Sequence, residues 1–306
     1  MKAVTVQKII KKYQTKKETV EAVKEVSFEV EKGELYGIIG PDGAGKTSLF
    51  RMLTTLLLPD GGSAVVDGFN VVKDYKAIRN RVGYMPGRFS LYQDLSVEEN
   101  LEFFATIFNT TVKENYDLVK DIYSQIEPFK KRRAGKLSGG MKQKLALSCA
   151  LIHRPSVLFL DEPTTGVDAV SRKEFWDMLK HLKQQGITIL VSTPYMDEAG
   201  MCDKVALMQN GKLLSVNTPQ GVVDEFGLPL LAAKGSNMLS LLKDIKNHEG
   251  VKDAYPFGEY HHIVLNNEKE KPQVEEYLKQ QQATVMNVKP VIEDCFMALM
   301  KEPAEQ

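Results

Sequence analysis

The sequence predicts an α/β protein in which a large domain, residues 1–222, precedes a small α+β domain, residues 223–306. Two observations carry this prediction. Short apolar runs alternate with helical stretches over the first two-thirds of the chain, which is typical of a mostly parallel sheet. Near residue 225 the pattern changes, and strand-like and helical stretches follow one another at shorter intervals. At 306 residues the chain is long enough for one large and one small domain.

Composition limits the classes of function. The 40 Lys and Arg residues equal the 40 Asp and Glu residues, and because nucleic-acid binding normally needs excess positive charge, we expect no nucleic-acid partner. No apolar run approaches the ~18–20 residues that cross a bilayer. We expect the widely spaced Cys149, Cys202 and Cys295 to be small buried side chains rather than disulfides or zinc ligands. These features predict a soluble protein of a reducing compartment.

The first predicted elements lead into a glycine-rich loop. Apolar and polar residues alternate over 20–30, which indicates a strand, and the apolar run 35–39 is expected to be a buried strand that ends at Gly40. A helix is predicted over 46–58, where Pro59 and the glycines that follow stop it.

A mostly helical lobe is predicted next. Ser96 and Glu99 have the spacing of a capping box, so a helix is expected to begin there, and residues 97–135 are expected to form a lobe beside the sheet. The remaining elements of the large domain are strands at 157–160, 188–191 and 204–208 and a hairpin turn at 209–212.

The last part of the chain reads as β-α-β-β-α-β. Such an order is compatible with a small ferredoxin-like sandwich. The expected strands are 228–233, 251–255, 262–265 and 284–288, and the expected helices are near 237–246 and 270–281.

The glycine-rich loop fits the P-loop template at every fixed position. Its residues are Gly40, Pro41, Asp42, Gly43, Ala44, Gly45, Lys46 and Thr47, and Ser48 adjoins them in the predicted site. The glycines let successive backbone N–H groups point at phosphate oxygens. Lys46 adds a positive charge, Thr47 offers its hydroxyl to magnesium, and the start of the following helix favours an anion. The loop therefore predicts a nucleotide-phosphate site.

A magnesium–nucleotide site also needs a carboxylate on a neighbouring strand. The apolar run 157–160 ends at Asp161 and Glu162, which places Asp161 at the carboxyl end of a buried strand. We expect Asp161 to hold the metal, directly or through water. Glu162 is then expected to be the general base for the attacking water.

Between the glycine-rich loop and Asp161, residues 137–143 resemble the signature motif of the ATP-binding cassette (ABC) family. The motif comprises Leu137, Ser138, Gly139, Gly140, Met141, Lys142 and Gln143. Tyr13 resembles the aromatic residue that stacks on adenine, and residues 164–168, which end at Asp168, resemble the D-loop. The resemblance covers residues 1 to about 220. It implies a cassette with a mostly parallel sheet, an antiparallel β region and a helical lobe that carries the signature.

This resemblance implies how the motifs act. Two cassettes close head to tail, so that each ATP lies between the P-loop of one chain and the signature of the other. Ser138 and the backbone amides of Gly139 and Gly140 precede a helix and form a second anion cradle, which faces the γ-phosphate of the partner's ATP. The implied activity is hydrolysis of ATP by water to ADP and phosphate, with Mg²⁺ as cofactor, Glu162 as base, and Tyr13 and residues 40–48 binding ATP.

Two positions depart from the family pattern. Gly87 stands where the family has the Q-loop glutamine, which touches magnesium and the attacking water. Pro194 stands where the family has the H-loop histidine, and proline offers neither an imidazole nor an N–H donor. Arg88 and Gln93 are candidates for part of the missing chemistry. Both losses fall in the site on this chain's own P-loop, so we expect impaired hydrolysis there and favour a heterodimer with a second ABC ATPase chain over a homodimer.

Two further stretches point to exporters. Residues 289–297 resemble the Pro-x-x-Glu-Asp-x-Phe tail of bacterial exporter ATPases, and residues 89–101 resemble the same group. Those ATPases serve transporters of drugs, antibiotics or surface polysaccharides whose membrane permease is a separate chain. The resemblance implies a cytoplasmic subunit, peripheral on the inner face of the cell membrane. We expect Phe89, Leu91 and Tyr92 to dock a cytoplasmic helix of the permease, unless they are local core.

Two other functions stay open. A soluble cassette ATPase of translation or DNA repair is disfavoured, because those proteins usually carry two cassettes or long coiled-coil arms. A non-hydrolysing cassette that binds ATP and completes a partner's site is favoured by the departures at Gly87 and Pro194.

Overall fold

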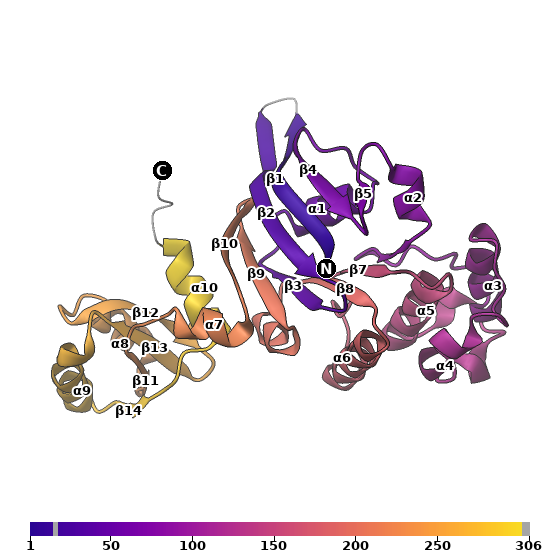
Figure 1. Ribbon diagram of the computed structural model, residues 1–306. Coiled ribbons are helices and arrows are strands. Elements are labelled where there is room, and N and C mark those ends of the chain that lie inside the picture. The colour runs from indigo at the N-terminus through magenta and orange to yellow at the C-terminus, as the bar shows by residue number, and fades with distance from the viewer. Residues whose placement is uncertain (15–17, 302–306) are drawn as a thin grey trace. The chain divides into compact units, whose positions relative to one another are not determined.

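A computed structural model describes residues 1–14 and 18–301. The chain divides into two compact units, Met1–Pro219 and Gln220–Gln306 (Figure 1).

The first unit is built on a six-stranded sheet, which confirms the predicted α/β class. The strand order is β10-β9-β3-β8-β7-β6. All neighbouring strands are parallel except β10, which pairs antiparallel with β9 at the edge. Its strands are β3 (Leu35–Ile39), β6 (Val82–Met85), β7 (Val157–Asp161), β8 (Thr188–Thr193), β9 (Lys204–Gln209) and β10 (Lys212–Asn217).

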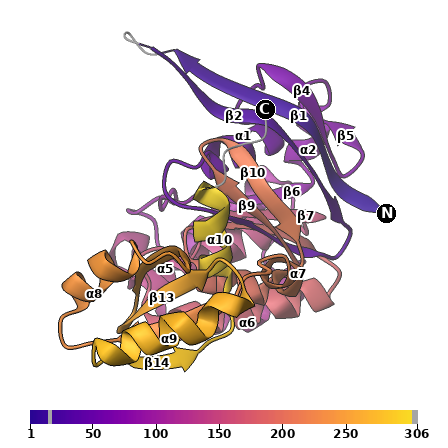
Figure 2. The same cartoon turned by 90° about the vertical axis from the view of Figure 1, so that its left-hand side faces the viewer.

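A second, antiparallel sheet has the strand order β2-β1-β4-β5. Helix α1 (Lys46–Leu53) lies between this sheet and the six-stranded sheet, as the two views in Figures 1 and 2 show. One core cluster unites apolar side chains from both sheets and from α1. Within it the rings of Phe50 on α1 and Phe159 on β7 pack edge to face, 5.6 Å between centroids. The strands are β1 (Lys2–Gln14), β2 (Thr19–Glu31), β4 (Gly61–Val66) and β5 (Phe69–Asn70).

The predicted strand at 20–30 is confirmed as β2, but β1 was not predicted. Its register against β2 shifts between Val6 and Ile9, and Lys8 in that stretch has a left-handed φ of 44°. These bulges interrupt the alternation of apolar and polar residues, which is the signal that would have indicated the strand.

The helix predicted over 46–58 ends earlier, at Leu53. Thr55 adopts a left-handed φ of 63°, and the N–H groups of Leu56 and Leu57 both donate to the carbonyl of Arg51, which closes the helix. Arg79 also donates to the Thr55 carbonyl and hydroxyl from the side. The predicted end of the helix, at Pro59, was therefore wrong, because the left-handed residue Thr55 ends the helix before Pro59 is reached.

The predicted helical lobe and its capping box are confirmed. Ser96 accepts a hydrogen bond from the Glu99 N–H, and the Glu99 carboxylate accepts one from the Ser96 N–H. Helices of the first unit are α2 (Tyr75–Arg79), α3 (Val97–Ile107), α4 (Tyr116–Tyr123), α5 (Gly139–Leu151) and α6 (Ala169–Gln184), with short 3₁₀ turns at η1 (Glu127–Phe129), η2 (Ala134–Lys136) and η3 (Met196–Met201).

The second unit has the predicted β-α-β-β-α-β order. Its four strands pair antiparallel in the order β12-β13-β11-β14, which is the arrangement of a ferredoxin-like sandwich. Its elements are β11 (Leu230–Lys234), α8 (Met238–Ile245), β12 (Val251–Phe257), β13 (Tyr260–Leu265), η4 (Glu268–Glu270), α9 (Lys271–Gln280), β14 (Thr284–Asn287) and α10 (Ile292–Lys301), and α7 (Pro219–Asp224) leads into them.

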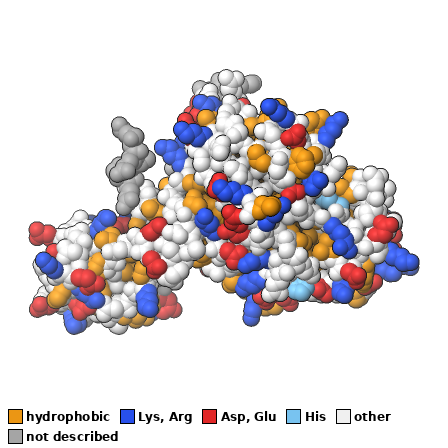
Figure 3. All heavy atoms as spheres, in the orientation of Figure 1, with side chains coloured by type: hydrophobic (Ala, Val, Ile, Leu, Met, Phe, Trp, Pro, Cys, Tyr) orange, Lys and Arg blue, Asp and Glu red, His pale blue; other side chains and the backbone are white. Residues whose placement is uncertain are grey.

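Surface and thiol features agree with the composition. The three cysteines are buried, and burial raises the pKa of each thiol, as expected for small apolar core residues. Across the face seen in Figure 3, Lys and Arg side chains are interspersed with Asp and Glu. Among the described helices, none is both long and apolar enough to cross a bilayer.

A buried carboxylate ties α10 to the sheet of the second unit. Asp294 is fully buried and accepts hydrogen bonds from the Tyr255 hydroxyl at 2.8 Å and from the Val291 N–H at 2.8 Å. His262 Nδ1 lies 2.6 Å from Oδ1 of the same side chain, within hydrogen-bond distance. Burial and the bond to Asp294 raise the pKa of Tyr255. Asp294 therefore bonds three groups at once, of which Tyr255 and His262 belong to buried residues.

Replacing Asp294 by Ala should lower the free energy of unfolding of the second unit by about 2–4 kcal/mol, because the buried donors lose their acceptor. Hydrogen exchange of the β13 amides in denaturant measures this loss. Glu293→Ala, at an exposed neighbour on the same helical turn, is the matched control and should leave the exchange unchanged. Equal exchange in the two variants would contradict the role of Asp294.

Candidate nucleotide-binding site

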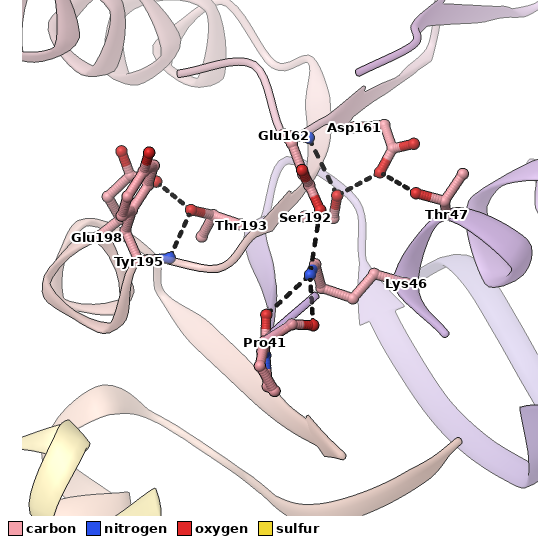
Figure 4. Close-up of polar contacts among 10 residues, drawn as sticks. Pro41, Lys46, Thr47, Asp161, Glu162, Ser192, Thr193, Tyr195 and Glu198 are labelled. Carbon is pink, nitrogen blue, oxygen red and sulfur yellow. Dashed lines mark hydrogen bonds and ion pairs between the residues drawn. The ribbon is translucent and has the colours of Figure 1, made fainter. Parts of the chain in front are cut away.

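The carboxyl ends of three adjacent parallel strands meet at the predicted site. β8 pairs with β3 on one side and with β7 on the other, so Gly40, Asp161 and Thr193 come to one edge of the sheet. The Gly40 N–H donates to the Thr193 carbonyl at 3.1 Å. Figure 4 shows the side chains that converge there.

The loop between β3 and α1 needs its glycines. Gly43 and Gly45 have left-handed φ values of 79° and 107°. A Cβ on Gly45 would lie 2.2 Å from the Ala22 carbonyl oxygen, and one on Gly40 would lie 2.0 Å from that of Met208. Only glycine lets the loop curl this closely against the neighbouring strands, and α1 then starts at Lys46 with its first N–H groups available to an anion.

The side chain of Lys46 lies inside the loop. It is 3% exposed, and its Nζ donates to the carbonyls of Gly40 at 2.8 Å and Pro41 at 3.0 Å. Its third partner is Glu162 Oε1 at 3.1 Å. The predicted phosphate-binding cation and the predicted base are thus paired with each other (Figure 4).

Thr47 and Asp161 are also brought together. Asp161 is 2% exposed, and its Oδ1 accepts hydrogen bonds from Thr47 Oγ1 at 3.2 Å and from Ser192 Oγ at 2.6 Å. Hard oxygen donors of this kind suit Mg²⁺. The described residues contain no cluster of three or more His, Cys, Asp or Glu side chains that could hold a metal alone. Thr47 and Asp161 therefore fit a magnesium ion that takes its other ligands from nucleotide phosphates and water.

Glu162 follows Asp161 in a strained conformation. Its φ of 49° is left-handed, which is costly for a residue with a side chain. Its N–H donates to the carbonyl of Ser192 at 2.9 Å and lies 3.1 Å from the Ser192 hydroxyl. Ser192 thus holds both carboxylate residues in place, and sequence reasoning missed it. The available signal was a hydroxyl directly after the apolar run 189–191.

Tyr13 lies beside the start of α1. Its hydroxyl is 3.1 Å from Ser48 Oγ, its ring is partly exposed, and the Lys11 ammonium lies 5.7 Å from the ring centroid. The structure therefore brings the predicted adenine-stacking residue next to the predicted phosphate loop.

The signature residues begin α5. Ser138 is exposed and caps this helix by accepting a hydrogen bond from the Met141 N–H at 3.3 Å, while Leu137 is buried. A Cβ on Gly140 would lie 2.9 Å from the Ser171 hydroxyl, so α5 approaches α6 closely here. Lys142 and Gln143 line a cavity of about 150 Å³ that Gly87, Arg88 and Glu162 also line.

Asp168 caps α6. Its carboxylate accepts hydrogen bonds from the N–H groups of Val170 and Ser171 and from the Ser171 hydroxyl. These bonds, led by the Ser171 N–H, hold the pKa of Asp168 below its usual range. This capping role is additional to the D-loop resemblance.

Gly87 lies next to the two acidic residues, and Pro194 follows the strand that carries Ser192. A Cβ on Gly87 would lie 3.0 Å from the Asp161 carbonyl oxygen and 3.7 Å from the Glu162 Cβ. Pro194 follows Thr193 directly at the end of β8. Of the two candidate substitutes, Arg88 lines the cavity beside Glu162, whereas Gln93 lies against Gly135 in the helical lobe.

A buried group next to the site was not predicted. Glu198 is 2% exposed and accepts a hydrogen bond from the hydroxyl of Thr193, which Figure 4 shows, and a second one from the hydroxyl of Thr164. A single acidic residue in a short turn gives no pattern that sequence reasoning can use, because its partners come from two distant segments, the end of β8 and the turn after β7.

Comparisons with known proteins agree with this geometry. A family profile described as ABC transporter matches residues 23–165. The chain is 38% identical to the probable multidrug ABC transporter ATP-binding protein YbhF of Escherichia coli over 91% of its own length and 49% of that protein, so it spans about half the length of YbhF. It is 36% identical to the Nod factor export ATP-binding protein I of Burkholderia lata, over 72% of this chain and 74% of that protein.

A solved structure supports the same fold. It is described as cbiO1 from Clostridium perfringens, part of the ABC transporter complex cbiONQ. The match covers 74% of this chain and 92% of that chain, with 27% sequence identity and a TM-score of 0.64.

Lys46→Ala should weaken binding of Mg–ATP about tenfold to a hundredfold, because it removes the cation buried in the phosphate loop. Titration calorimetry on the full chain measures the affinity. Lys113→Ala, at an exposed position in the helical lobe, is the control and should bind as the unmodified chain does. Unchanged affinity in the Lys46 variant would sink the assignment of this loop.

Proposed function

Because this chain belongs to the ABC transporter family of ATP-binding proteins, we propose that it is the ATP-hydrolysing subunit of an exporter whose membrane permease is a separate chain. The observation that carries this proposal is the convergence of Lys46, Thr47, Asp161 and Glu162 at one edge of the parallel sheet. The names of the relatives, which include multidrug transport and Nod factor export, support the exporter class.

The proposed reaction is attack of water on the γ-phosphorus of ATP. Glu162 takes a proton from the water as the new P–O bond forms, and the bond to the bridging oxygen breaks, which leaves ADP and phosphate. Lys46 binds the phosphates in place of its present carboxylate partner, so its transfer to the nucleotide frees Glu162 for the water. Thr47 and Asp161 hold Mg²⁺, which neutralises charge on the phosphates when bound.

The signature side of the chain is proposed to serve a second cassette. Ser138 is exposed at the N-terminus of α5, where helix N–H groups attract an anion. Together with Gly139 and Gly140 it would contact the γ-phosphate held on the partner's P-loop.

The chain's own site is proposed to be impaired. Gly87 lies beside Asp161 and Glu162, and Pro194 follows the end of β8, yet neither offers a side-chain donor to the attacking water or the γ-phosphate. Loss of one such contact typically costs ~10²–10³ in rate. A heterodimer is therefore favoured, in which a second ABC ATPase chain supplies the site that Ser138 completes. The departures also favour one alternative, a cassette that binds ATP without hydrolysing it.

A groove in the first unit is proposed to dock the permease. A largely apolar cavity of about 470 Å³ is lined by Leu91, Phe104, Ile107 and Phe108, among others. Such a groove suits the apolar face of a short helix. Of the predicted docking residues, Leu91 is buried at the groove, Tyr92 is 51% exposed and packs edge-on against Phe103, and Phe89 lies under the Lys142 ammonium. This docking would place the chain on the inner face of the cell membrane.

The double replacement Gly87→Gln with Pro194→His should raise steady-state ATP turnover of the purified chain on the order of 10²-fold, because it restores both missing side chains. Phosphate release measures the rate, and the Glu162→Gln chain gives the background. A Cβ at position 87 comes 3.0 Å from the Asp161 carbonyl, so Pro194→His alone provides an arm without this crowding. Brisk turnover by the unmodified chain with no gain in either variant would favour a homodimeric ATPase instead.

Ile107→Glu should reduce recovery of the chain in the membrane fraction of cells that produce it, because it places a charge in the apolar groove. Mg–ATP affinity should be unchanged. Leu239→Glu, at an 82% exposed apolar residue of the second unit, is the matched control and should fractionate as the unmodified chain does. Equal recovery of all three chains would remove the groove as the docking surface.

A further inference from the structure

Glu198 joins the end of β8 to the turn that follows β7. It lies in the turn η3 and is 2% exposed. Its Oε1 accepts a hydrogen bond from Thr164 Oγ1 at 2.7 Å, and its Oε2 accepts one from Thr193 Oγ1 at 2.5 Å. Both threonines are fully buried. The two oxygens of one carboxylate therefore hold two separate segments.

These segments connect the phosphate loop to the D-loop, residues 164–168. Thr193 ends β8, and its carbonyl accepts the N–H of Gly40, the first residue of the phosphate loop. Thr164 is the first residue of the D-loop. Three hydrogen bonds thus connect Gly40 to Thr164. The first uses the backbone carbonyl of Thr193, the second joins the Thr193 hydroxyl to Glu198, and the third joins Glu198 to the Thr164 hydroxyl.

Arg172 on α6 compensates the buried charge. Its Nε lies 3.5 Å from Glu198 Oε1, and its guanidinium stacks 4.0 Å from the ring centroid of Tyr195. The backbone N–H of Arg172 also donates to the backbone carbonyl of Asp168, the last residue of the D-loop. Removing one partner of a compensated buried charge is costly, so a substitution of Glu198 or Arg172 alone would disturb this arrangement.

The same carboxylate fixes the turn that contains Pro194. Proline has no N–H, so its own backbone cannot donate a hydrogen bond to anchor this turn. The Tyr195 N–H donates to Thr193 Oγ1 at 3.1 Å, and that hydroxyl in turn donates to Glu198. The path of the chain at the position without the family's histidine therefore depends on Glu198.

We propose that Glu198 is a positioning residue that transmits nucleotide occupancy of the phosphate loop to the D-loop. A bound phosphate that shifts Gly40 acts on Thr193, and the rigid carboxylate carries the shift to Thr164. The inference rests on the proposed function, because it needs Mg–ATP to bind at Lys46.

Hydrogen exchange on the full chain, with and without Mg²⁺ and ATP, tests this proposal. In the unmodified chain, ATP should change the exchange of amides in both residues 40–48 and the D-loop. Glu198→Gln leaves one acceptor oxygen for two hydroxyl donors, so it should keep the response of the phosphate loop, with affinity within about threefold, and reduce the D-loop response at least about fivefold.

Two further variants separate transmission from folding and from simple charge. Thr164→Val is nearly isosteric and removes only the hydrogen bond between Thr164 and Glu198. It should likewise keep the response of residues 40–48 and reduce that of the D-loop, so it tests the proposal even if Glu198→Gln does not fold. Asp197→Asn removes the neighbouring carboxylate, 3.8 Å from Arg172, without touching either threonine, and should respond as the unmodified chain does.

Each other outcome is decisive. A D-loop that does not respond to ATP in the unmodified chain, or that responds fully in Thr164→Val, overturns the proposal, as does an equal loss in Asp197→Asn. In all these cases ATP binding survives, and so does the proposed function. Absence of any ATP response at residues 40–48 in the unmodified chain overturns the proposed function and this inference with it.

Discussion

The parallel pairing of β8 between β3 and β7 is the constraint on which the rest of the site depends. It brings the end of each strand to one edge, so that residues far apart in the sequence, Gly40, Asp161 and Thr193, become neighbours. Because the strands are buried on both faces, a slip in register would expose apolar side chains. The core that stabilises the fold therefore also fixes the geometry of the chemistry.

Buried charge is the cost of this arrangement, and the protein meets it in pairs. Lys46 is matched by Glu162, and Glu198 is matched by Arg172 and two hydroxyls. Such pairs contribute little net stability, but they are expensive to break one partner at a time. A charged side chain in such a pair can therefore leave its partner only when it gains another. Binding of a polyphosphate beside Lys46 would supply such a new partner.

Sequence reasoning succeeded where a signal is local. The glycine-rich loop between a buried strand and a helix, the acidic end of β7, the capping box at Ser96 and the β-α-β-β-α-β order were predictable, because spacing or alternation within a short window determines them. It failed where geometry is made by tertiary contact. The bulged strand β1, the early end of α1 and the roles of Ser192 and Glu198 depend on neighbours from distant segments, and no window of sequence contains those neighbours.

The departures from the family pattern at Gly87 and Pro194 lie outside the hydrogen bonds that connect Gly40 to Thr164. Gly87 and Pro194 remove side chains that would act on ATP, yet the hydrogen bonds from Gly40 through Thr193 and Glu198 to Thr164 bypass both positions. Relaying nucleotide occupancy needs only binding and a rigid connection, whereas hydrolysis needs donors aimed at the transition state. The proposed relay from the phosphate loop to the D-loop therefore requires only nucleotide binding and is independent of the proposed loss of hydrolysis.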